Sequence, residues 1–186
     1  MPRNATWTNA DGLIVGFGTH TEDNGVLAVT GDSGTRRTYV IELPAAASLE
    51  DTDAITVASL GPQHAVIPRG SKIVSASFSV TTVFTSEGSA TLDIGTYEAA
   101  GDGSSSGDDD ADGIDADIAL TALDAVGDLV VCDGALITGA VACGAVADAD
   151  VTVVFGFEAA AFTAGAGVLT LEVIVPSGSQ GRSLAA

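Results

Sequence analysis

The residues best suited to chemistry are closely spaced aspartates near the middle of the chain. Asp108, Asp110 and Asp112 stand at alternate positions and are followed by Gly113 and Ile114. This order is typical of the first half of a calcium loop. In such a loop, side-chain oxygens bind the ion, the glycine makes a sharp turn, and the next residue contributes its carbonyl oxygen.

The second half of this calcium pattern is incomplete. Position twelve, where a bidentate glutamate is expected, is Ala119, and only Asp115 or Asp117 stands nearby to replace it. Two interpretations therefore stay open. The segment is either an exposed acidic loop tip or a non-standard loop that holds a structural calcium ion, and we expect no other cofactor.

Two hydrolase-like patterns occur without the partners that their chemistry needs. Residues 31–34 have the Gly-Asp-Ser-Gly letters of a trypsin-like nucleophile, and residues 103–107 fit Gly-x-Ser-x-Gly. Both mechanisms need a histidine base, far upstream in the first case and late in the chain in the second. The two histidines, His20 and His64, stand at neither place. The sequence therefore predicts a protein that is not an enzyme.

The two cysteines, Cys132 and Cys143, match no zinc pattern. They flank a segment, residues 134–139, that we expect to form a hairpin, so a disulfide is possible if the flanking strands pair. In a reducing cytosol the expected state is two buried thiols.

Composition limits the function classes further. The chain has 186 residues, 46% of them hydrophobic, with a mean hydropathy of +0.40, which is typical of a folded single domain. It carries 25 acidic and 6 basic residues, for a net charge of −19. So acidic a surface repels polyanions, and we therefore expect no binding to nucleic acid or to an anionic membrane.

Charge is unevenly distributed along the chain. Residues 1–72 hold five basic and eight acidic residues, whereas residues 73–181 hold 17 acidic residues and no Lys or Arg. The acidic part is either a solvated outer surface or one side of a molecule whose N-terminal part faces a partner.

Alternating apolar residues predict strands in most of the chain. The clearest runs from Lys72 to Thr85, where Val74, Ala76, Phe78, Val80 and Phe84 are expected on one face. Similar alternation appears in the ranges 13–17, 39–43, 151–157 and 169–175, and shorter strands are expected at 55–57, 92–94, 129–131 and 136–141. The predicted fold is all-β: an antiparallel β-sandwich or jelly-roll-like single domain with one short helix.

The helix is expected at about Asp115 to Val126, where Ile114, Ile118 and Ala122 share a face at helical spacing. Pro44 to Asp51 predicts one further helical turn. We expect residues 1–11 to form an N-terminal arm or edge strand and residues 12–186 to form the β-sandwich domain.

The order of several segments resembles small decoration, or cement, proteins of tailed phages that infect marine bacteria and cyanobacteria. The resemblance begins with residues 7–19, Trp-Thr-Asn-Ala-Asp-Gly-Leu-Ile-Val-Gly-Phe-Gly-Thr. It continues through residues 66–76, 90–96, 113–116 and 162–169 and covers most of the chain. It carries no catalytic signature.

This resemblance implies a non-enzymatic virion protein that is made in the host cytoplasm and binds the outer surface of the major capsid protein shell, often as a homotrimer. Arg and Trp are common interface anchors, so we expect the capsid contact at Arg3, Trp7, Arg36 and Arg37. The alternative for residues 1–9 is a first edge strand with Trp7 in the core. The alternative for the whole chain is a secreted or surface β-sandwich adhesin or carbohydrate-binding module with structural calcium.

Overall fold

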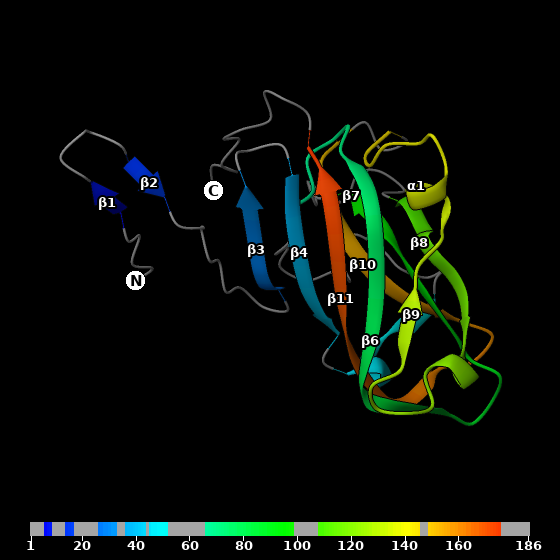
Figure 1. Cartoon of the computed structure of the whole chain (residues 1–186). Coiled ribbons are helices and arrows are strands. Elements are labelled where there is room, and N and C mark those ends of the chain that lie inside the picture. The colour runs from blue at the N-terminus through cyan, green and yellow to red at the C-terminus, as the bar shows by residue number, and fades with distance from the viewer. Residues whose placement is uncertain are drawn as a thin grey trace.

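The structure is a computed structural model of the whole chain. It describes residues 6–8, 14–16, 26–32, 36–43, 45–51, 66–98, 108–145 and 149–175. Figure 1 shows two sheets, one in front of the other, that pack as the layers of a β-sandwich. The predicted all-β, single-domain fold is thereby confirmed.

The front layer in Figure 1 is a five-stranded sheet in the order β3-β4-β11-β6-β9, and all of its ladders are antiparallel. Its strands are β3 (Val26–Asp32), β4 (Arg36–Leu43), β11 (Phe162–Ile174), β6 (Lys72–Ser86) and β9 (Leu129–Val131). The long central strands β6 and β11 lie beside each other, so each is held on both edges.

The second layer is a four-stranded sheet in the order β5-β10-β7-β8. It contains β5 (Glu50–Asp51), β10 (Val151–Glu158), β7 (Thr91–Glu98) and β8 (Asp108–Ala119). The short β5 pairs with β10 in parallel and the other ladders are antiparallel, so this sheet is mixed.

Two further strands, β1 (Thr6–Thr8) and β2 (Ile14–Gly16), pair with each other across the boundary expected between residues 11 and 12. Their two-stranded ladder is separate from both larger sheets. The helical elements are short: the 3₁₀ turns η1 (Ala46–Ser48) and η3 (Leu120–Ala122), and α1 (Ala135–Thr138). The helical turn expected within residues 44–51 is confirmed as η1.

The core lies between the two sheets and is built from the alternate, inward-facing residues of their strands. Phe78 is central: its ring centroid lies 6.0 Å from that of Phe84 and 6.1 Å from that of Phe155. Phe84 in turn lies edge-on to Phe162 at 5.3 Å. Edge-to-face rings of this kind stabilise a core beyond the area that they bury.

The alternation along β6 is interrupted near Val74, which explains why one predicted core residue is wrong. Val74 is 40% exposed, while its neighbour Ile73 is buried. The pairing of β6 with β11 shifts at this point, so that Val74 is an extra residue in a bulge. A bulge reverses which residues face inward, and sequence alternation alone does not reveal it.

Two other predicted elements are wrong. The helix expected from Asp115 to Val126 is instead the end of strand β8, followed by η3. Ile114 and Ile118 are both buried, and residues four apart share a face in a strand as well as in a helix. The strand expected at residues 136–141 is α1 with the loop that follows it.

The strands expected at residues 92–94 and 129–131 are confirmed in β7 and β9. The strand expected at 55–57, the motif at 103–107, His20 and His64 lie outside the described residues.

Candidate interaction surface

The outer face of the five-stranded sheet carries few charges on strands β4, β11 and β6, whose side chains the structure describes. Buried residues such as Phe78, Leu169 and Ile41 face the core, so the residues that alternate with them face outward. On β4, β11 and the middle of β6 these outward residues are Arg36, Thr38, Val40, Glu42, Ser75, Ser77, Ser79, Val168, Thr170 and Glu172. Only three of the ten are charged, in a chain whose net charge is −19. We call this set the outer face.

Two of the three charges on the outer face neutralise each other. The Arg36 guanidinium lies 2.8 Å from a Glu172 carboxylate oxygen, and both side chains are well exposed. The Ser75 hydroxyl also reaches that oxygen, at 3.5 Å. An exposed ion pair contributes little stability, so its main effect here is to leave a patch with almost no net charge.

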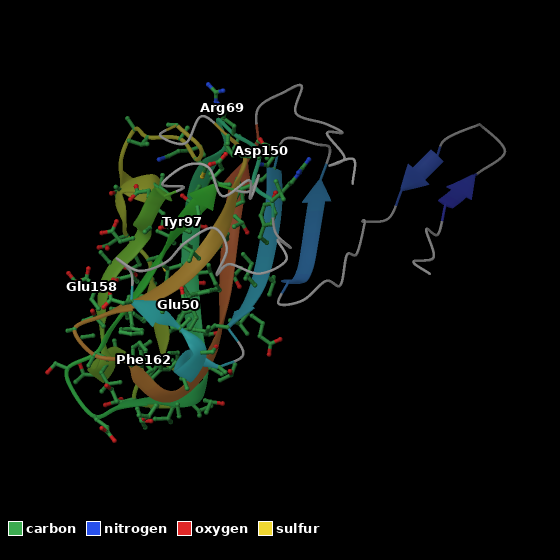
Figure 2. All side chains as sticks on the ribbon, turned by 180° about the vertical axis from the view of Figure 1, so that it is seen from behind. Glu50, Arg69, Tyr97, Asp150, Glu158 and Phe162 are labelled. Atoms are coloured by element: carbon green, nitrogen blue, oxygen red, sulfur yellow. The ribbon has the colours of Figure 1, made fainter. Side chains whose placement is uncertain are left out.

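Most of the exposed acidic residues in the described part of the chain lie on other elements. Exposed acidic residues in the described part of the chain include Glu50 and Asp51 on β5, Asp112 and Asp117 on β8, and Glu158 at the end of β10. Figure 2, seen from behind, shows Glu50 and Glu158 on the side of the four-stranded sheet. The molecule therefore has a low-charge side and an acidic side.

The low-charge side ends in exposed apolar residues on β9. Leu129 is 63% exposed and Val131 is 73% exposed, and they lie opposite Ser79 and Ser77 of β6. Residues directly opposite in a ladder share a face, so both side chains extend the outer face to the edge of the sheet.

The segment that follows β9 joins the two layers. The Cys132 amide donates to the Ala76 carbonyl of the five-stranded sheet at 3.1 Å. Two residues later, the Gly134 amide donates to the Ile114 carbonyl of the four-stranded sheet at 3.0 Å. A side chain at position 134 would collide with the backbone of β8, so glycine permits this close approach.

Two of the predicted capsid-contact residues, Arg36 and Arg37, lie on opposite faces of one strand. Arg36 lies on the outer face, but its neighbour Arg37 is on the opposite face of β4, where its side chain hydrogen-bonds Tyr39. Trp7 lies in β1, paired with Val15, and Arg3 lies outside the described residues. Burial is the main reason that the pKa of Tyr39 is raised.

The predicted calcium residues lie in strand β8, whose pairing with β7 shifts register between Asp110 and Asp115. A side chain at Gly113 would overlap the carboxylate of Asp110. Ile114 is fully buried, and its carbonyl accepts the Gly134 amide. Asp108 and Asp112 lie on the same strand, and no described group of three His, Cys, Asp or Glu side chains is placed to hold a metal ion.

A buried polar pair lies where β8 meets the segment after β9. Asp115 is 7% exposed and hydrogen-bonded to the Cys132 thiol. Burial, and then the nearby charge of Asp133, raise the pKa of the Asp115 carboxyl. Burial, together with Asp115, raises the pKa of Cys132 to about 12. A thiol with so high a pKa stays protonated at neutral pH and is a poor nucleophile.

Cys132 and Cys143 are both buried and are not joined in a disulfide, which confirms the prediction of two buried thiols. Among the described residues, no helix is long and apolar enough to cross a membrane.

The sequence predicts a strand at β9 but gives no sign that its edge is a candidate site. The order of strands in a sheet decides which edge is open, and periodicity does not report that order.

Comparison with known proteins adds no relative. No protein-family model matches the chain, and neither a curated protein nor a solved structure matches it.

Proposed function

We propose that this chain is a non-enzymatic virion protein that binds the outer surface of a phage head and stabilises the shell of the major capsid protein. The observation that carries this proposal is the low charge of the outer face on a protein of net charge −19. Cores of protein interfaces are depleted of charged residues, whereas a surface that only faces water has no such need.

The uneven distribution of charge supports binding through the outer face, with the acidic side turned away from the shell. A decoration protein needs one adhesive face and one face that does not attract further copies. The outer face, with its Ser, Thr and Val side chains, fits the first role, and the acidic side on β5, β8 and β10 fits the second. A protein whose contacts span neighbouring capsid subunits binds only the assembled shell. It therefore stabilises that shell by mass action.

Co-sedimentation with empty shells of the major capsid protein encoded in the same genome tests this function. We expect the wild-type chain to sediment with the shells and to raise the temperature at which they disassemble. Ser77→Glu, which places a charge in the middle of the outer face, should weaken binding at least tenfold.

Ala116→Glu is the matched control, because it adds the same charge at an exposed position on β8. Its binding should equal that of the wild type. A wild-type chain that does not sediment with the shells would contradict the proposed function, and equal binding by both variants would contradict the assignment of the face.

A further inference from the structure

The last strand of the five-stranded sheet has an edge that no described strand covers. The Asp128 carbonyl accepts a hydrogen bond from the Val80 amide of β6, and the Cys132 amide donates one to the Ala76 carbonyl of β6. In an antiparallel ladder the bonded residues alternate, so Val130 also faces β6. Leu129 and Val131 therefore direct their N–H and C=O groups away from β6, toward the open edge.

This edge is short but otherwise lacks the usual protection against strand pairing. Natural sheet edges are blocked by very short strands, lysines, prolines, inward-pointing charges or a covering element, and of these β9 has only its length of three residues. The three residues of β9 are Leu129, Val130 and Val131, with no charge or proline among them. The exposed side chains of Leu129 and Val131 lie beside the outward N–H and C=O groups. An added strand therefore gains both hydrogen bonds and apolar contact.

Charges around the edge select the kind of strand that it accepts. Asp128 and Asp133 flank β9, and Asp124 lies in the turn before it. No Lys or Arg occurs between residues 73 and 181, so no basic residue lies on β9 or beside it in the sequence. A second copy of this chain brings a further net charge of −19 and is repelled. A segment that carries basic residues is attracted.

We propose that the open edge of β9 receives an extended segment of the partner protein as an additional strand. The segment is apolar at alternate positions and carries Lys or Arg at its ends. This inference rests on the proposed function, because the major capsid protein is the partner that supplies the segment.

Binding to shells tests the inference with two matched variants. Val131→Lys places a positive charge on the edge, and Val126→Lys makes the same change at a residue that is 67% exposed but precedes the strand. We expect Val131→Lys to weaken shell binding at least tenfold and Val126→Lys to change it less than twofold. Wild-type-like binding by Val131→Lys, or equal weakening by both variants, would overturn the inference while leaving the proposed function standing.

A peptide separates this inference from the proposed function. The probe is a fluorescent peptide of alternating Val and Thr with two lysines at each end, and its control has the same charge but prolines at two central positions. Anisotropy should show that the first peptide binds the wild-type chain, that Val131→Lys weakens this at least tenfold, and that the proline peptide does not bind.

Absence of binding by the first peptide, or equal binding of both peptides, would overturn strand addition even if the shells bind. Light scattering tests whether a second copy of this chain occupies the edge instead. A wild-type oligomer that Val131→Lys dissociates would show that a second copy takes the edge and would likewise overturn the inference.

Discussion

The side-chain nitrogen of Lys72 lies 2.6 Å from the carbonyl oxygen of Gly139, immediately after α1. The same nitrogen donates to the Leu136 carbonyl at 2.8 Å. Lys72 is the single lysine of the chain, and it begins β6. A cation at the C-terminal end of a helix satisfies carbonyl groups that have no partner within the helix. The only lysine therefore fixes α1 against the five-stranded sheet.

Lys72→Met should destabilise the fold, because it leaves those partly buried carbonyls without their charged donor. The expected loss is about 2 kcal/mol in the free energy of unfolding. Urea unfolding followed by circular dichroism measures it. Arg36→Met removes the same charge from an exposed ion pair and should cost less than about 0.5 kcal/mol. Equal losses would show that the contacts of Lys72 with α1 carry no special weight.

Two glycines should respond to alanine for different reasons. A side chain at Gly167 would overlap the Phe78 ring, so Gly167→Ala should displace the core and cost about 2 kcal/mol. Gly127 has a φ of +93° and open space around its Cβ position, so Gly127→Ala should cost only backbone strain, about 1 kcal/mol. Thermal unfolding measures both losses. Only Gly167→Ala should also alter the near-UV signal of the aromatic core.

Asp115 should make stability depend on pH. Its pKa is raised in the fold above the ordinary 3.8, because the ionised form is buried. The folded state therefore holds this proton more tightly than the unfolded state does. The resulting stability is fully present below pH 3.8 and is lost as the pH rises through the raised pKa.

Asp115→Asn should consequently gain stability relative to the wild type as the pH increases from 3.8 toward neutrality. Urea midpoints across this range give the difference. Asp124→Asn, at an exposed turn, changes the net charge equally and serves as the control. If both variants differ from the wild type by the same amount at every pH, the change in stability comes from net charge alone.

The native thiols should resist modification. Cys132 and Cys143 are buried, and the pKa of Cys132 is raised to about 12, so a chromogenic disulfide reagent at pH 8 should find no reactive thiol until urea unfolds the chain. Val131→Cys places a thiol at a position that is 73% exposed in the wild type, and this thiol alone should react promptly. Rapid reaction of the folded wild type would contradict the burial of the pair.

Chelation should leave the unfolding temperature unchanged. Residues 108–119 form a strand, and the carbonyl of Ile114, proposed from the sequence as a calcium ligand, already accepts the Gly134 amide. Differential scanning calorimetry with calcium and with a chelator is the measurement. A rise in the unfolding temperature of several degrees with calcium would restore the calcium hypothesis.

Strands could be predicted where burial on one face imposes strict alternation, as it does for Phe78 and Val80 on β6. The prediction failed at Val74, where a bulge shifts the register, and at Ile114 and Ile118, whose spacing satisfies a strand and a helix equally. Local pattern carries no information about these choices, because they depend on contacts between distant strands.

The candidate site was harder to predict for the same reason. Arg36 and Arg37 are adjacent in sequence, yet the alternation of β4 places them on opposite faces of the sheet. The sequence predicts an ordinary strand at Leu129 and Val131, and only the strand order shows that they lie at an open edge. Sequence indicates which residues are in strands, whereas the assembled sheet decides which of them remain available to a partner.

The hydrogen bonds on either side of Asp133 have a mechanical consequence. The amide of Cys132 is attached to one layer and that of Gly134 to the other, so a force that pulls on β9 is divided between the two sheets. A tensile load that runs along the strands must shear several hydrogen bonds together instead of opening them one at a time. A short segment with two anchors thus resists being peeled from the edge of the sandwich and passes tension into the body of the protein.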